Sequence, residues 1–330
     1  MQATDRRTWL ILLALGGAGL PLSAPAQPVA KVYRIGYLSA ASEEAQRASR
    51  ELFLRALAQH GWVEGRNLAV ESRFANGVVD ALSRLAAELA RARVDVIVTT
   101  AGSTTALAAK RATDRIPIVF TSGGDPVEVG IVSNLARPGG NVTGVAGDLT
   151  VLEKRLEALR DVTPKATRYG VLVNPDNRVH ATVVRPLEAA AARLKITLKQ
   201  ISVRDPGGFD DAWAVIKRDG LGGVVMLGDA MFQTHGKRLI ALAAEARLPM
   251  VFATSQLVRE GGLMSFAVDV LSLQRQAAEI VDRILRGTLP SEIPIEEPRK
   301  FEMVVNLKTA DAMGLTIPQA VLLMADEVVR

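Results

Sequence analysis

Segments typical of β-strands alternate with segments typical of α-helices along almost the whole chain after residue 31. In the clearest example, a β-branched run at 94–100 ends in small residues and leads directly into an alanine-rich helical segment at 106–112. A second buried-type run at 116–120 also ends in small hydroxyl and glycine residues. Alternation of this kind predicts parallel β-sheets with helices on both faces. We therefore expect an α/β protein.

The alternation continues through two successive segments of similar length. With 330 residues, of which 48% are hydrophobic, the chain can supply two hydrophobic cores. We expect two lobes of similar design, lobe 1 at 32–145 and lobe 2 at 146–268, which face each other across a cleft. The segment 269–330 is expected to cross back and complete lobe 1 through a multi-strand hinge, although periodicity leaves open which strand joins which sheet. Helices are predicted at 233–247 and at 318–328, among other places.

The first 26 residues have the features of an export signal. Arg6 and Arg7 precede an apolar run at 9–22, and the small residues at 24–26 offer a cleavage site. The run is shorter than the about 20 residues that cross a bilayer. We expect a cleaved signal peptide at 1–26 and a periplasmic location, and the arginine pair leaves the Sec and twin-arginine routes both open. Because cysteine is absent, no lipid anchor is expected.

The residues that most metal and hydrolytic sites need are scarce. His60, His180 and His235 show no metal-binding spacing, and each is expected on the surface of a helix. Ser103 follows a predicted strand, but no histidine is placed at a strand end to act as its base. We expect no enzymatic activity, no cofactor and no metal. The net charge of +5 is scattered rather than gathered in a basic stripe, so nucleic acid is not an expected partner.

Small and polar residues gather where the predicted strands end, which is the edge where open α/β sheets bind ligands. In lobe 1, hydroxyls and helix N-terminal N–H groups could take a carboxylate; Asp229 or Asp269 could accept hydrogen bonds from an ammonium group. Each aspartate could equally cap the helix that follows it. The candidate ligand-binding residues are Ser39, Ala40, Ser42, Thr100, Ala101, Gly102, Ser103, Thr104, Thr121, Ser122, Gly123, Asn174, Asp229 and Asp269. Together they predict a site for an amino acid.

Long motifs over most of the chain resemble those of the ABC transporter substrate-binding family that is often grouped with tryptophan and tyrosine uptake. They are RIGYLS at 34–39, GWVEGRNLAVESRFANG at 61–77, DVIVTTAGSTTALAAKRAT at 95–113, IPIVFTSGGDPVEVGIVSNLARPGGNVTGV at 116–145, VLVNPDN at 171–177, GGLMSF at 261–266 and NLKTADAMGLTIP at 306–318. The resemblance implies a type I periplasmic-binding-protein fold, in which hinged lobes trap a ligand and deliver it to a permease.

The resemblance also implies roles for particular residues. Turns of lobe 1 that match 100–104 and 121–123 would hold the carboxylate of an amino acid, and Asp229 and Asn174 would supply an acidic and an amide group from lobe 2. We expect a monomeric component of an ABC importer that works with a permease and an ATPase. Its ligand would be an amino acid, with aromatic ones among the candidates, or a related carboxylate. The alternative with the same fold is a ligand-sensing subunit for a receptor kinase.

Overall fold

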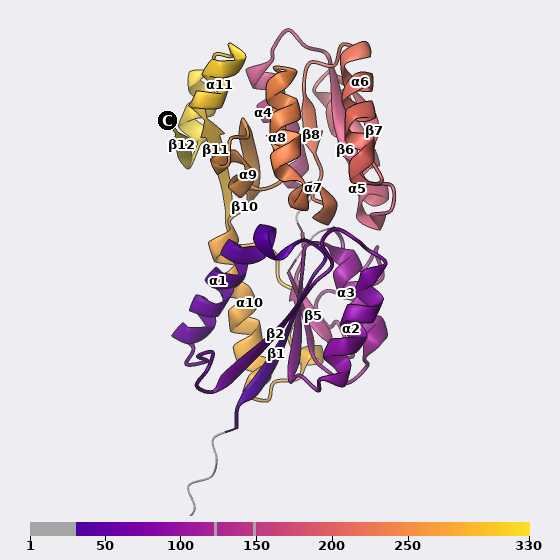
Figure 1. Cartoon of the computed structure of the whole chain (residues 1–330), viewed down its shortest axis with the longest axis vertical. Helices are drawn as coiled ribbons and strands as arrows, with labels where there is room; N and C mark the ends of the chain where they lie inside the picture. The colour runs from indigo at the N-terminus through magenta and orange to yellow at the C-terminus, as the bar shows by residue number, and fades with distance from the viewer. Residues whose placement is uncertain (1–30, 122–123, 148–149) are drawn as a thin grey trace, which may run out of the picture. The chain divides into compact units, whose positions relative to one another are not determined.

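The computed structural model describes residues 31–121, 124–147 and 150–330. The predicted signal peptide at 1–26 and the candidate site residues Ser122 and Gly123 lie outside the described residues. Within these ranges the chain forms two mainly parallel β-sheets, each with helices on both faces (Figure 1). This arrangement confirms the predicted α/β fold class. We call the first sheet with its helices lobe 1 and the second sheet with its helices lobe 2.

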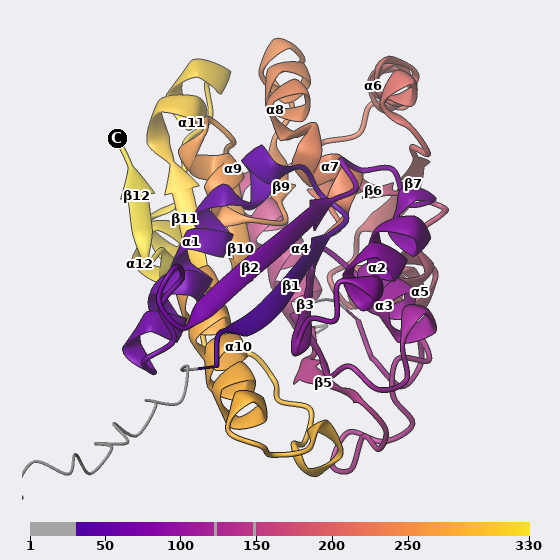
Figure 2. The same ribbon diagram turned by 60° about the horizontal axis from the view of Figure 1, so that its bottom comes forward.

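The first sheet has the strand order β2-β1-β3-β4-β5, and all of its pairs are parallel. Its register aligns Ser39 with Thr100, so the carboxyl ends of neighbouring strands meet at one edge. Helices α1 and α10 cover one face, and α2 and α3 cover the other (Figure 2). The bounds are β1 (Tyr33–Ser39), β2 (Leu68–Phe74), β3 (Val96–Thr100), β4 (Ile118–Thr121), β5 (Val142–Val145), α1 (Glu43–Gln59), α2 (Ala81–Arg91), α3 (Ser103–Ala112) and α10 (Val270–Leu285).

The second sheet has the strand order β12-β11-β10-β9-β8-β6-β7, and its pairs are parallel except for β10 with β11. Helices α4, α5, α11 and α12 cover one face, and α6, α7, α8 and α9 cover the other. The strands are β6 (Arg168–Val173), β7 (Thr197–Ser202), β8 (Val224–Met226), β9 (Met250–Phe252), β10 (Met264–Val268), β11 (Phe301–Asn306) and β12 (Glu327–Val329). The helices are α4 (Thr150–Val162), α5 (Arg178–Arg193), α6 (Phe209–Arg218), α7 (Ala230–Thr234), α8 (Gly236–Glu245), α9 (Ser255–Arg259), α11 (Leu307–Met313) and α12 (Gln319–Met324), with short 3-10 helices at Pro206–Gly208 and Pro290–Glu292.

Helix α2 illustrates how residue spacing fixes the way a helix lies on its sheet. Its apolar residues recur every three or four positions, and Leu82, Leu85, Ala86 and Leu89 are all buried in one cluster against the first sheet. Each buried leucine side chain contributes about 1.5–3 kcal/mol to the free energy of unfolding. The helix is therefore held by its apolar face.

The segment 269–330 is divided between the lobes, which differs from its expected assignment to lobe 1. Helix α10 does pack against the first sheet, where Ala277 and Val281 join the core. Strands β11 and β12, however, belong to the second sheet, because β11 pairs with β10 and β12 pairs with β11. The chain thus passes between the lobes after β5, after β10 and before β11. Any exposed sheet edge offers unpaired N–H and C=O groups, so strand composition alone cannot choose between two edges.

The predicted terminal helix at 318–328 is wrong beyond Met324. The backbone N–H of Asp326 donates to the carbonyl of Met303 at 2.9 Å, and the Asp326 carboxylate accepts from the Met303 N–H at 2.8 Å. These two bonds turn the chain toward β11 and start a new strand. The predicted helix at 233–247 is likewise divided into α7 and α8.

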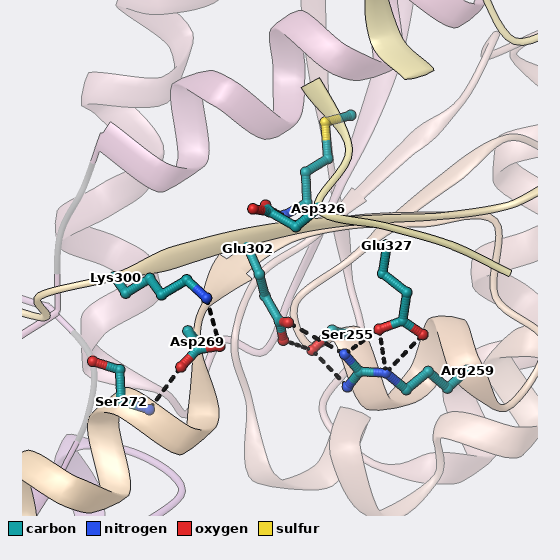
Figure 3. Close-up of polar contacts among 9 residues, drawn as sticks. Ser255, Arg259, Asp269, Ser272, Lys300, Glu302, Asp326 and Glu327 are labelled. Atoms are coloured by element: carbon teal, nitrogen blue, oxygen red, sulfur yellow. Dashed lines mark hydrogen bonds and ion pairs between the residues drawn. The ribbon is translucent and has the colours of Figure 1, made fainter. Parts of the chain in front are cut away.

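Strand β12 is held at the edge of the second sheet by Arg259. Its guanidinium forms ion pairs with Glu302 of β11 at 3.2 Å and with Glu327 of β12 at 2.6 Å (Figure 3). Arg259 ends α9, a five-residue helix that the sequence pattern did not predict. The ion pairs connect α9 to two strands that periodicity could not place.

Candidate functional site

A cavity of about 260 Å³ lies at the carboxyl ends of strands from both lobes. This is the edge at which open α/β sheets bind ligands, and the volume is at the small end for ligand pockets. The cavity therefore suits a small molecule. Lobe 1 lines it with Thr100, Ala101, Gly102, Thr121 and residues of α10, and lobe 2 with Arg155, His180, Leu227, Gly228, Asp229, Ala253, Thr254, Ala267 and Val268, among others.

The turn between β3 and α3 brings lobe 1 to the cavity. Ala101 has φ +60° and Gly102 has φ +117°. Positive φ is uncommon for a residue other than glycine, and backbone strain of this kind clusters at ligand-binding turns. The Thr100 hydroxyl donates to Gln46 Oε1, and the Thr121 hydroxyl donates to the Thr99 carbonyl, both at 3.3 Å. The hydroxyl protons of Thr100 and Thr121 are thus used within the protein.

A neutral polar network lies behind the lobe 1 wall. Gln46 is buried on α1, and its Oε1 also accepts from the Tyr37 hydroxyl at 3.3 Å. Burial raises the pKa of Tyr37 to about 12, so the phenol stays protonated. On α10, Gln274 donates from Nε2 to Ser49 Oγ at 2.9 Å, whereas its Oε1 has no hydrogen-bond partner in the described part of the chain. Lobe 1 therefore meets the cavity with neutral groups.

Asp229 lies on the lobe 2 wall and is only 6% exposed. Its Oδ1 accepts from the N–H groups of Met231 and Phe232 at 2.9 and 3.4 Å, which caps α7. Its Oδ2 accepts from the side-chain amides of Asn174 and Asn177 at 3.2 and 2.9 Å. A carboxylate has about four lone-pair positions, and protein donors occupy all of them here.

His180 does not lie on a helix surface, as the sequence suggested, but is buried beside Asp229 and lines the cavity. Its Nδ1 accepts from the Asn174 N–H at 2.8 Å, and its Nε2 lies 3.1 Å from the Gly228 carbonyl. Because an N–H only donates and a carbonyl only accepts, the ring is neutral with its proton on Nε2. Burial lowers the pKa of His180 below its usual 6.5, and the Asp229 charge opposes this in part.

Arg155 of α4 is the single cation that lines the cavity among the described residues, and sequence reasoning missed it. It is 6% exposed and donates from Nε to the Phe266 carbonyl at 2.8 Å. Its Nη1 and Nη2 donate to the carbonyls of Met226 at 3.2 Å and Ala253 at 3.1 Å. Burial lowers the pKa of Arg155 to about 10, which leaves it charged near neutral pH. The available signal was its position on the apolar stripe of α4, one turn after Val151.

The candidate residues from the sequence fall into two groups. Thr100, Ala101, Gly102, Thr121 and Asp229 line the cavity together. Of the other described candidates, Ser42 lines a neighbouring groove, and Asn174 lies behind Asp229. Ser39 Oγ accepts from the Ala41 N–H at 3.1 Å, and Ser39, Ala40, Ser103 and Thr104 lie outside the described lining.

Asp269 also lies outside the described lining and is held by two protein partners. It caps α10 by accepting from the Ser272 N–H at 2.7 Å, and Lys300 Nζ lies 3.7 Å from its other oxygen (Figure 3). The structure therefore shows the capping role. A ligand contact for Asp269 stays a prediction, as it does for the other candidates.

A second, more open groove of about 380 Å³ adjoins the cavity between the start of α1 and helices α7–α9. The lobes contact each other along it. The Ser42 N–H donates to Thr234 Oγ1 at 3.2 Å, and Gln46 Nε2 donates to Gln233 Oε1 at 3.4 Å. At the surface, Lys237 Nζ forms an ion pair with Glu44 at 2.7 Å. These contacts join the two lobes directly through protein groups.

Metal and membrane features were also sought among the described residues. No cluster of three or more His, Asp or Glu side chains is placed there to hold a metal ion. None of the helices in these ranges combines the length and apolarity that a membrane span requires.

Comparison with known proteins gives consistent matches over most of the chain. The family model described as "ABC transporter substrate binding protein" matches residues 34–329. A tyrosine-binding protein of Clostridioides difficile is 27% identical over 265 residues, which cover 80% of this chain and 75% of that protein. The crystal structure of a conserved domain protein from Vibrio cholerae O1 biovar eltor is 28% identical, with a TM-score of 0.84, and the match covers 90% of this chain and 100% of that one.

An ABC domain from Streptococcus pneumonia, solved in complex with L-Trp, has a TM-score of 0.83 at 22% identity. The match covers 90% of this chain and 99% of that one, and it supports the two-lobed fold.

Proposed function

Since this chain belongs to the family of ABC transporter substrate-binding proteins, we propose that it is the solute-binding component of an ABC importer. The observation that carries the proposal is the small cavity lined from the carboxyl ends of both sheets. A ligand that contacts both lobes binds the closed arrangement more tightly than an open one, and so shifts the protein toward it. A permease that recognises the closed arrangement would then receive loaded protein preferentially.

The proposed ligand is an amino acid or a related carboxylate, with aromatic amino acids as the first candidates. The tyrosine-binding relative supports this class at 27% identity. The cavity wall also combines one cation and one carboxylate with apolar side chains from α4, α5 and α10, among them Leu152, Val183 and Leu273. Apolar walls with a few fixed polar groups are typical of sites for small organic ligands.

The remaining parts of the proposal follow from the family and the sequence. The partners would be a permease, contacted from the periplasm, and its ATPase. The signal peptide at 1–26 would direct the protein to the periplasm and be cleaved before Gln27. A binding protein needs no catalytic group, and the family and the tyrosine-binding relative support a role in binding rather than catalysis. The alternative, a sensing subunit for a receptor kinase, is not favoured by the family or the relatives.

A thermal-shift screen of the purified protein tests the ligand class. A ligand at 100 times its dissociation constant adds about 2.7 kcal/mol to the free energy of unfolding, which raises the melting temperature by several degrees. We expect L-tyrosine or another L-amino acid to produce this shift and D-glucose to leave the melting temperature unchanged. A shift produced by sugars but by no amino acid or carboxylate would refute the proposed ligand class.

A further inference from the structure

We propose that Arg155 holds the anionic group of the ligand, so that the carboxylate of a bound amino acid is neutralised from lobe 2 rather than by the hydroxyls of lobe 1. This inference rests on the proposed function and names the group in the cavity that selects for an acid. It differs from the expectation that the turns at 100–104 and 121–123 take the carboxylate.

The first step is the unmatched charge of Arg155. Its side chain lines the cavity and is 6% exposed, yet it forms no ion pair with any described residue. The three carbonyls that it contacts belong to Met226, Ala253 and Phe266, at the ends of three neighbouring strands. Carbonyl dipoles lower the cost of burying a cation but do not cancel its charge. An anion in the cavity would cancel it.

The second step is the donor capacity that remains on the guanidinium. A guanidinium has five N–H groups, and the three bonds to carbonyls use Nε, one hydrogen of Nη1 and one hydrogen of Nη2. Among the described residues, no acceptor remains for one N–H on each Nη. Two charged donors on one planar group suit a carboxylate, which accepts from arginine in a paired geometry.

The third step is that the side-chain donors of Thr100, Thr121 and His180 on the wall are already engaged. The hydroxyl protons of Thr100 and Thr121 go to protein oxygens, and the Nε2 proton of His180 goes to the Gly228 carbonyl. Asp229 does not neutralise Arg155, because the pair is not within ion-pair distance and four protein donors already occupy the Asp229 oxygens. Among the described residues that line the cavity, Arg155 is therefore the charged donor that still has N–H groups available to a ligand.

Isothermal titration calorimetry with L-tyrosine and L-tyrosinamide tests the inference, because the amide removes the carboxylate charge and keeps the rest of the ligand. Wild-type protein should bind tyrosine about 10- to 100-fold more tightly than tyrosinamide, the range of a charge-assisted hydrogen bond. Arg155→Gln should weaken tyrosine binding by a similar factor and reduce the discrimination to about twofold. Arg160→Gln is the matched control, since Arg160 lies on the same helix but pairs with Asp161 at the surface.

The experiment distinguishes two roles for Arg155: bracing the ends of the strands, or binding the carboxylate of the ligand. If Arg155 only braced the strands, Arg155→Gln would weaken both ligands equally and leave the discrimination unchanged, which would overturn the inference while the proposed function stands. Wild-type protein that binds both ligands equally would overturn it without any variant. If Arg155→Gln does not fold, Arg155→Lys, which keeps the charge but loses the paired donors, should fold and show an intermediate discrimination. Failure of wild-type protein to bind tyrosine at all would overturn the inference and count against the proposed ligand class.

Discussion

Gly124 offers a direct test of whether the observed approach of the two lobes is the arrangement that binds ligand. It lies in lobe 1 and lines the cavity opposite Val179 of α5 in lobe 2. A Cβ added to Gly124 would lie 2.7 Å from Val179 Cγ1, 3.1 Å from Cγ2 and 3.5 Å from Cβ. Because both methyl groups are close and valine in a helix strongly prefers one rotamer, rotation of the valine relieves the overlap only in part. The lobes or the local backbone would have to move apart by several tenths of an ångström.

Overlap of this kind typically costs about 1–3 kcal/mol. If ligand binding needs the observed approach, Gly124→Ala should weaken ligand affinity by about 5- to 150-fold. Gly124 has φ +80°, so alanine also strains the backbone there, and Gly130 with φ +82° and no neighbour within 4 Å supplies the matched control. Gly130→Ala should carry the same backbone cost of about 1–2 kcal/mol and leave affinity unchanged.

Calorimetric titration with the ligand found in the thermal-shift screen would measure both variants, and urea unfolding would confirm that they lose similar free energy of unfolding. The double variant Gly124→Ala/Val179→Ala should recover most of the lost affinity, because it removes both methyl groups that meet the new Cβ. Equal affinity for the Gly124 and Gly130 variants would refute the link between lobe approach and binding.

Two further predictions concern the cluster around Asp229. The free energy of unfolding should fall as the pH drops below about 6.5, by at most about 1.4 kcal/mol per pH unit, because unfolded His180 takes a proton that the buried ring resists. Urea titrations from pH 5 to 8 should show this slope in wild type and a flatter one in His180→Gln; parallel curves would contradict it. Asp229→Ala should lower the free energy of unfolding by about 2–4 kcal/mol, since it removes a cap and leaves buried donors unpaired. Asp205→Ala, at an exposed cap, is the control, and equal urea midpoints would contradict the prediction.

The strands with strong local signals could be predicted closely from the sequence. The runs at 94–100 and 116–120 overlap β3 and β4, because short apolar runs rich in β-branched residues favour buried strands. Strand β12 could not be predicted, since its start depends on the contact between Asp326 and Met303, which lie far apart in sequence. Local periodicity contains no information about such a pairing.

The candidate site shows the same division. Thr100, Gly102 and Thr121 could be placed at the cavity because parallel topology brings the carboxyl ends of strands to one edge. Arg155 and His180 reach the cavity from helices, and helix periodicity describes them only as residues on a buried or exposed face. Their roles depend on which carbonyls and N–H groups the folded chain brings to them.

The contacts between the lobes along the outer groove have a consequence for the proposed binding function. The pairs Ser42–Thr234, Gln46–Gln233 and Glu44–Lys237 join protein groups of the two lobes directly, and such contacts stabilise the apposed lobes whether or not a ligand is bound. If the lobes close on a ligand as proposed, these contacts raise its apparent affinity by lowering the free energy that binding must supply to bring the lobes together. They also raise the fraction of ligand-free protein that is closed. Under the proposed importer function, stronger contacts here would favour ligand capture at low concentration but would also let closed, ligand-free protein dock on the permease. Because Glu44–Lys237 is an exposed ion pair, salt would weaken it and so lower the fraction of ligand-free protein that is closed.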